Sequence, residues 1–223
     1  MQLHLRRLQS HSCYHSGVNV APNKPLTGPT FSGLLDTVFL DRDGVLNEKM
    51  PEGLFVTCWS EFKVLPGVVE AIGMLNTAGI RVVVVSNQRG VALGLYTEEN
   101  VREIQAEFQK LLGTHGAHVD AFYFCPHEEG LCNCRKPLPG MFEQAVADFP
   151  TINQASSFMI GDGLPDIDFG RRLGMKTVFV EGDPERQKPG AEAARDLADM
   201  SFPSLYAAVC GLLASATAPR SRF

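Results

Sequence analysis

Two aspartates stand two positions apart directly after a short apolar run. Asp41 and Asp43 follow residues 37–40, and Gly44 permits a tight turn behind them. Neighbouring carboxylates repel each other, and a hard cation such as Mg²⁺ relieves the repulsion because it prefers carboxylate and carbonyl oxygens. One carboxylate could then attack phosphorus while the other protonates the leaving oxygen. Taken alone, the pair fits a solvated turn nearly as well, since Asp and Gly both favour turns.

Further along the chain are residues that suit a phosphoryl group. Ser86 and Asn87 follow four consecutive valines, and a hydroxyl and an amide at the end of a strand can hold phosphate oxygens. Lys136 can neutralise charge on a transferring phosphoryl group, and Arg135 can grip a second anionic group with two hydrogen bonds. Each of these residues is also common in caps, turns or surfaces, so their weight comes from occurring together.

A third apolar run ends at Asp162, with Asp166 four positions later. Asp162 can complete a magnesium shell begun by Asp41 and Asp43. Asp166 can hold a water ligand of the metal, cap the following helix, or do both. The sequence therefore predicts a magnesium site built from carboxylates that are far apart in the chain.

Of the six cysteines, three lie within ten residues. Together with one histidine they form the ligand set of a closed tetrahedral zinc site: Cys125, His127, Cys132 and Cys134. The alternative is three free cysteines beside a surface histidine, whereas a disulfide between two cysteines separated by one residue would be strained. Because the motif leads directly into Arg135 and Lys136, a bound zinc ion would fix both cations and act structurally.

Alternating apolar segments define the elements that position these residues. Strands are expected over 37–40, 82–85, 121–124, 158–160 and 177–180, and helices between Gly67 and Gly79, after a cap at Thr97, and over 141–149 and 169–173. This alternation predicts an α/β fold with a doubly wound parallel sheet, covered by helices on both faces. Ligand sites in such sheets lie beyond the carboxyl ends of the strands, where the polar motifs fall.

Composition limits the classes of function. The 223 residues are 44% hydrophobic and 20% charged, which suits a globular chain with a sizeable core. A net charge of −5 gives no general attraction to nucleic acid or to anionic membranes. No apolar run approaches the ~20 residues of a spanning helix. We therefore expect a cytoplasmic monomer without nucleic-acid or membrane partners.

The organisation expected from the sequence is a single domain over 36–213. Residues 1–35 contain no acidic side chain and read as a flexible leader, with a targeting segment as the alternative. Residues 214–223 are expected to form a frayed tail.

In order and placement, the motifs resemble those of the haloacid dehalogenase superfamily of phosphohydrolases. The resemblance covers about 37–180 and rests on Asp41-x-Asp43, Ser86, Lys136 and Gly161-Asp162-x-x-x-Asp166. It implies an Mg²⁺-dependent phosphomonoesterase that forms an aspartyl-phosphate. Asp41 would be the nucleophile, Asp43 the general acid and base, and Ser86 and Lys136 the phosphoryl-binding residues. The implied magnesium ligands are Asp41, the Asp43 carbonyl and Asp162.

The zinc motif narrows the resemblance to one branch, the heptose-bisphosphate and histidinol-phosphate phosphatases. Both carry Cys-x-His and then Cys-x-Cys-Arg-Lys-Pro, and the segments around Asp41 and Ser86 are more similar to the heptose enzymes. That branch is essentially capless, with a zinc-stabilised loop shaping the site. It implies a phosphorylated sugar as substrate, D-glycero-D-manno-heptose 1,7-bisphosphate first. The implied substrate contacts are Asn87, Gln88, Arg89 and Arg135.

The chain departs from the heptose enzymes at three places that concern substrate recognition. Leu93 stands where they usually have Arg, Gly163 where they often have Lys, and residues 48–53 replace a loop of a different type. Histidinol phosphate stays open as an alternative substrate, because Glu48 and Glu52 could receive its ammonium group. A zinc-dependent binding module is a more remote alternative, disfavoured by the lack of a basic stripe and of stacking aromatics.

Overall fold

The computed structural model describes residues 35–187 and 189–217. Within these residues six parallel strands form one sheet in the order β3-β2-β1-β4-β5-β6. The strands are β1 (Thr37–Leu40), β2 (Arg81–Asn87), β3 (Ala121–Cys125), β4 (Ser157–Gly161), β5 (Lys176–Val180) and β6 (Met200–Phe202). The chain builds outward from β1 to β3 and returns to the other side of β1 at β4. This is the doubly wound order expected from the sequence.

The centre of the sheet is buried on both faces. On one face Leu40 of β1 aligns with Val84 of β2 and Ile160 of β4, and each is at most 1% exposed. On the other face Phe39 aligns with Val83 and Met159, and each is fully buried. Strands buried on both faces need apolar residues at every position, which explains why these segments read as continuous apolar runs rather than alternating ones.

Helices cover both faces. They are α1 (Val68–Thr77), α2 (Glu98–Thr114), α3 (Gly140–Asp148), α4 (Leu164–Arg172), α5 (Ala191–Leu197) and α6 (Leu205–Thr217). Val82 and Val84 belong to the core that includes side chains of α1, α2 and α6. Val83 and Val85 belong to the opposite core, with side chains of α3 and α4. Successive residues of β2 thus divide between the two cores, as the pleat requires.

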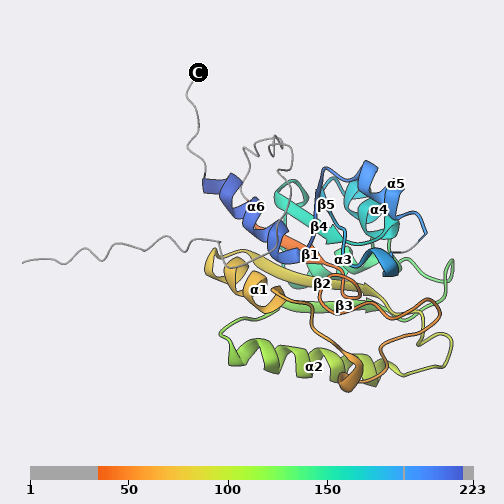
Figure 1. The fold of residues 1–223 in the computed structure, drawn as a ribbon. Coiled ribbons are helices and arrows are strands. Elements are labelled where there is room, and N and C mark those ends of the chain that lie inside the picture. Colours follow the sequence, from red (N-terminus) through yellow and green to blue (C-terminus); the bar gives the residue numbers. More distant parts are fainter. Residues whose placement is uncertain (1–34, 188, 218–223) are drawn as a thin grey trace, which may run out of the picture.

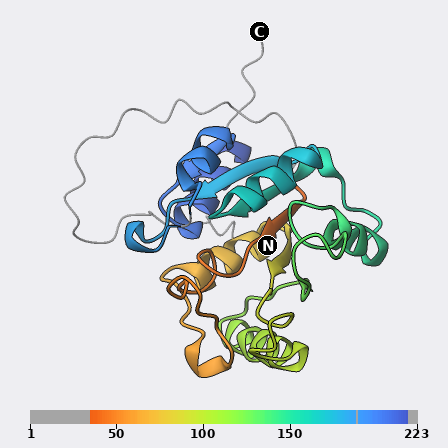
Figure 2. The ribbon, with the colours of Figure 1, turned by 90° about the vertical axis from the view of Figure 1, so that its right-hand side faces the viewer.

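The carboxyl ends of the central strands meet at one edge of the sheet, where the order reverses between β1 and β4. In Figure 1, α2 lies at the bottom, α4 and α5 lie toward the top right, and the loops that follow β1 and β2 gather at the right. Figure 2 presents that edge to the viewer. Asp41, Ser86 and Asp162 follow or end β1, β2 and β4 at this edge. The topology therefore brings together motifs that are up to 121 positions apart in the sequence.

Three elements near the C-terminal end were not expected from the sequence: α5, β6 and α6. The first two are only seven and three residues long, and α6 is rich in small apolar residues without a polar face. Helix α6 extends to Thr217 and so includes 214–217, the first part of the expected tail, while 218–223 lie outside the described residues. The leader expected over 1–35 also lies outside them, except for Leu35.

Among the described residues, no helix has both the length and the apolar character that crossing a bilayer requires.

Candidate active site and metal centre

Lys136 lies at the centre of the strand-end motifs. Its Nζ is 2.8 Å from Oδ1 of Asp41, 2.6 Å from Oδ1 of Asp166, and donates to the backbone oxygen of Val85 at 2.6 Å. The side chain is 1% exposed. Burial by itself would lower the pKa of Lys136, but the carboxylates of Asp166 and Asp41 outweigh it and raise the pKa above its ordinary value. The structure therefore holds a charged ammonium group between two carboxylates.

A long-range contact positions Lys136, and local contacts position Asp166. The side-chain amide of Asn87, at the end of β2, donates to the Lys136 carbonyl at 3.1 Å and accepts from the Lys136 N–H at 2.9 Å. Asp166 accepts the N–H of Gly163 at 3.1 Å and so caps the start of α4, as expected. Its side chain packs against Gly161 so closely that a Cβ there would collide with it. Asn87 thus positions the backbone of Lys136, and Gly161, which has no Cβ, leaves room for the side chain of Asp166.

Three buried carboxylates form what we call the carboxylate cluster: Asp41, Asp162 and Asp166, with oxygens within 4.8 Å of one another. A second ammonium group, that of Lys49, contacts Oδ2 of Asp162. Gly44 lets the chain after β1 pass this close, since its φ is +98° and a Cβ would collide with Asp162. With Lys136 and Lys49, two ammonium groups face three carboxylates. The remaining negative charge and the hard oxygen donors fit a divalent cation such as Mg²⁺.

Asp43 faces a different environment from Asp41. Its carboxylate accepts hydrogen bonds from Arg42 at 3.1 and 2.9 Å, from Asn47 at 3.0 Å and from Gln88 at 3.1 Å. Burial favours a raised pKa, but the Arg42 guanidinium and the other donors outweigh it and lower the pKa of Asp43. The side chain keeps 26% exposure and lines the larger cavity described below. Asp43 is thus an oriented carboxylate at the edge of a pocket, outside the carboxylate cluster.

Ser86 is held by a short chain of hydrogen bonds. Gln88 Nε2 donates to Ser86 Oγ at 2.6 Å, and Tyr96 donates its hydroxyl proton to Gln88 Oε1 at 2.7 Å. All three side chains are buried. Since Ser86 Oγ accepts from Gln88, its own hydroxyl proton is available to another acceptor. The sequence did not point to Tyr96, because its role depends on a contact across eight positions of irregular chain.

Of the four expected substrate contacts, three have partners within the protein. Asn87 pairs with the backbone of Lys136, and Gln88 with the network above. Arg89 Nε donates to Glu128 at 2.8 Å. By contrast, Nη1 of Arg135 is buried and has no hydrogen-bond partner among the described residues. Arg135 thus has one buried donor without a partner among the described residues.

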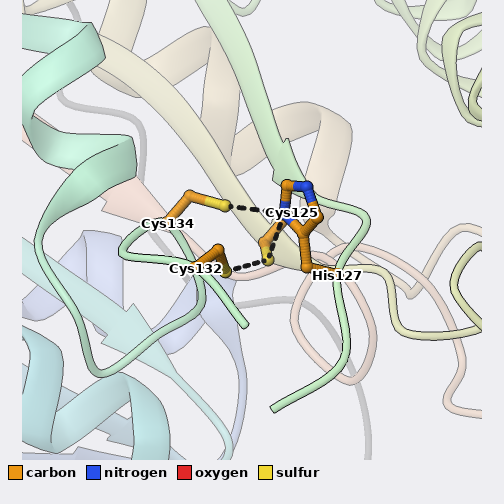
Figure 3. A group of neighbouring side chains, drawn as sticks. All are labelled: Cys125, His127, Cys132 and Cys134. Atoms are coloured by element: carbon orange, nitrogen blue, oxygen red, sulfur yellow. Dashed lines mark hydrogen bonds between the residues drawn. The ribbon is translucent and has the colours of Figure 1, made fainter. Parts of the chain in front are cut away.

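The Cys-rich loop brings four side chains together in what we call the thiol cluster: Cys125, His127, Cys132 and Cys134 (Figure 3). The Sγ atoms of Cys125 and Cys132 are 3.5 Å apart. His127 Nδ1 lies 3.3 Å from Cys134 Sγ and 3.8 Å from Cys125 Sγ. A tetrahedral zinc ion with bonds of about 2.0–2.3 Å requires ligands separated by roughly this much, whereas a disulfide needs about 2.05 Å. The cluster fits zinc in number, type and spacing of its ligands.

The three cysteines of the thiol cluster differ in the direction of their pKa shifts. Burial raises the pKa of Cys125 and of Cys134, and the neighbouring sulfurs add to this at Cys134. At Cys132, hydrogen bonds from the Cys134 thiol and from the backbone N–H of Arg135 outweigh burial and lower the pKa to about 7. A state in which all three cysteines are thiolates would therefore require a positive ion beside them.

Two cavities adjoin the strand ends. One of about 740 Å³ is lined by Arg42, Asp43 and Gln88, and by the loop over 49–56. A smaller one of about 150 Å³ lies beside Asp162. Lys49 lines both cavities, although no motif in the sequence points to it. Lys49 lies in a loop, and contacts between loops leave no periodic pattern in the sequence from which they could be predicted.

Comparison with known proteins agrees with this geometry. The family described as HAD-hydrolase-like matches residues 133–208. D-glycero-D-manno-heptose-1,7-bisphosphate 7-phosphatase of Chlorobaculum tepidum is 34% identical, over 79% of this chain and 93% of the relative. The β-anomer phosphatase of Photorhabdus laumondii is also 34% identical, over 80% and 97%. The α-anomer phosphatase of Mycobacterium tuberculosis is 34% identical, over 76% and 87%.

A solved structure shares the architecture at similar coverage. The D,D-heptose 1,7-bisphosphate phosphatase of B. bronchiseptica, complexed with magnesium and phosphate, has a TM-score of 0.72 and 30% identity, over 80% of this chain and 98% of that one. The sequence motifs, the fold and these relatives agree that this chain is a phosphoric monoester hydrolase. It belongs to the haloacid dehalogenase superfamily, in the branch of the heptose-bisphosphate phosphatases.

Proposed function

We propose that the enzyme removes a phosphate from a small phosphorylated sugar through an aspartyl-phosphate on Asp41. The observation that carries this proposal is the position of the Lys136 ammonium, 2.8 Å from Asp41 and beside the carboxylate cluster. A carboxylate held in place by a fixed cation is oriented to attack phosphorus. The same cation neutralises charge on the phosphoryl oxygens as it develops.

The chain's own residues account for both half-reactions. A carboxylate oxygen of Asp41 bonds to phosphorus while the bond from phosphorus to the sugar oxygen breaks, and Asp43 gives that oxygen a proton. Asp43 then takes a proton from the water that attacks phosphorus, which releases phosphate and restores Asp41. Ser86 donates its hydroxyl proton to a phosphoryl oxygen throughout.

Two metals complete this proposal. Asp41, Asp162 and the carbonyl of Asp43 would hold Mg²⁺, which supplies positive charge against the phosphoryl oxygens. The thiol cluster would hold a structural zinc ion, which keeps Arg135 and Lys136 in place. The support is the hard-oxygen donor set in the first case and the ligand spacing in the second.

For the substrate we propose D-glycero-D-manno-heptose 1,7-bisphosphate. The relatives named for it cover most of this chain, and a cavity of about 740 Å³ is large enough for a sugar bisphosphate. The buried Nη1 of Arg135 is a candidate donor to the second phosphate. Relatives of both anomeric preferences are equally similar, so the anomer is left open. Histidinol phosphate fits less well, because Glu48 lies 3.6 Å from Arg186 and its charge is partly neutralised.

The test is phosphate release with Mg²⁺ from five substrates: the two anomers of the heptose bisphosphate, histidinol phosphate, fructose bisphosphate and p-nitrophenyl phosphate. We expect kcat/KM for one heptose anomer to exceed the other substrates by about 100-fold, or roughly 2.7 kcal/mol. Uniformly slow hydrolysis of all these compounds would contradict the heptose bisphosphate as the substrate, while the proposed phosphatase chemistry would stand. The cytoplasmic location, the monomeric state and the domain limits stay predictions.

A further inference from the structure

Lys49 makes a contact that the proposed reaction does not use. Its ammonium group touches Oδ2 of Asp162, and the two side chains are only 12% and 6% exposed. An ion pair this far from solvent is screened little, so its two charges affect each other strongly. Asp162 is at the same time a proposed magnesium ligand, and two cations therefore share one carboxylate.

The main chain around Lys49 is fixed. Arg186 Nη1 donates to the Lys49 carbonyl at 2.8 Å, and the N–H of Glu48 donates to the Lys63 carbonyl at 2.8 Å. Asn47 Nδ2 donates to the Glu48 carbonyl at 2.8 Å. These bonds anchor the backbone from both sides of the loop. The placement of the ammonium beside Asp162 is therefore built into the fold.

The side chain, in contrast, has room to move. Lys49 lines both the cavity of about 150 Å³ beside Asp162 and the larger one of about 740 Å³. A lysine stem of four carbons can turn about several bonds while its backbone stays still. The ammonium group can thus leave Asp162 for solvent-filled space without any change in the loop.

We propose that Lys49 is an internal competitor of Mg²⁺. In the metal-free enzyme its ammonium neutralises Asp162, and metal binding displaces it into the adjoining cavity. Leaving a buried carboxylate without a cation is costly, so the ammonium stabilises the metal-free cluster and lowers its affinity for Mg²⁺. This inference rests on the proposed function, since it takes Asp162 as a magnesium ligand.

Calorimetric titration of Mg²⁺ into the full-length, metal-free chain tests the competition. Lys49→Met removes the charge and keeps the stem, and we expect it to bind Mg²⁺ roughly tenfold more tightly than wild type. Lys49→Arg keeps the charge and should bind within about threefold of wild type. Lys63→Met, which removes an exposed lysine from a neighbouring position, should bind like wild type. Unchanged or weaker binding by Lys49→Met would overturn the proposal.

Amine reactivity tests the displacement without relying on a variant. Brief acetylation of the wild-type chain, followed by peptide mass spectrometry, reports how accessible each lysine amine is. We expect Mg²⁺ to raise acetylation of Lys49 several-fold and to leave Lys63 unchanged. Equal acetylation of Lys49 with and without Mg²⁺ would contradict displacement. If neither wild type nor Lys49→Met binds Mg²⁺, the proposed role of Asp162 as a magnesium ligand is contradicted as well. If both bind Mg²⁺ equally tightly, only the proposed competition by Lys49 is contradicted.

Discussion

The carboxylate cluster and the thiol cluster both gather ligand atoms within 4.8 Å, yet they are supported differently. The carboxylates stand at the ends of β1 and β4 and at the start of α4, and they face the ammonium groups of Lys136 and Lys49. The thiols come from the end of β3 and from a loop without helix or strand. The first arrangement is held by the sheet and balanced by protein cations, so a metal there would add chemistry. The second has two of its three thiols on a loop outside the sheet, so a metal there would add structure.

The largest effect should follow from Asp41→Asn. The amide keeps the shape of the side chain and removes the nucleophile, so kcat should fall by roughly 10⁴-fold or more. The sheet still holds the cluster, and the melting temperature should change by no more than about 3 °C. Phosphate release and thermal denaturation measure the two effects. Near wild-type turnover would contradict the role of Asp41 as nucleophile. Failure to fold would contradict the contrast between a carboxylate cluster that adds chemistry and a thiol cluster that adds structure.

Cys132→Ser should instead affect stability and zinc content together. We expect less than one zinc per chain, a loss of about 2 kcal/mol or more in the free energy of unfolding, and a melting temperature lower by roughly 4–8 °C. Turnover should fall about 10- to 100-fold, because the loop leads into Arg135 and Lys136. The control is Cys58→Ser, at an exposed free cysteine outside the cluster, which should change neither zinc content nor stability.

Full zinc content in Cys132→Ser, with an unchanged melting temperature, would contradict the structural role of the thiol cluster. Metal analysis and differential scanning calorimetry of the purified variant decide between the outcomes.

A smaller effect is expected from Tyr96→Phe. It removes the hydroxyl that donates to Gln88, and the amide that orients both Asp43 and Ser86 loses one of its anchors. We expect kcat to fall several-fold and stability by about 1 kcal/mol. Tyr123→Phe is the matched control, since its hydroxyl donates to Asp148 at 2.7 Å away from the site and should leave kcat unchanged. Equal kcat in the two variants would show that the network does not support the reaction.

Asp199→Asn shows how much stability depends on a carboxylate that lies outside both clusters. Burial tends to raise its pKa, but Lys176 and Thr177 outweigh it and hold the pKa below its ordinary value of 3.8. A lowered pKa in the folded state means stability that is present above pH 3.8 and lost as the pH falls through the folded value. Asp199→Asn should therefore melt below wild type at pH 7, by an amount that shrinks in acid, with turnover unchanged. A difference in melting temperature between Asp199→Asn and wild type that does not change with pH would contradict this expectation.

Much of the fold and the identity of both clusters follow from local sequence. The strands read as apolar runs, the helices carry caps such as Thr97, and the metal-binding residue types recur at recognisable spacings. What local sequence did not reveal depends on distant contacts. Lys49 reaches Asp162 across 113 positions, and Asn87 holds the backbone of Lys136 across 49. Such partners are set by how loops meet above the sheet, and loops carry no period from which the meeting could be inferred.

In the proposed reaction Asp41 carries the phosphoryl group. The most direct test is acid quenching of a reaction with saturating heptose bisphosphate on the millisecond timescale, followed by peptide mass spectrometry. We expect a transient phosphoryl adduct on Asp41 in the wild-type chain and none in Asp41→Asn. An adduct on another residue, or turnover without any adduct on Asp41 at any quench time, would contradict it.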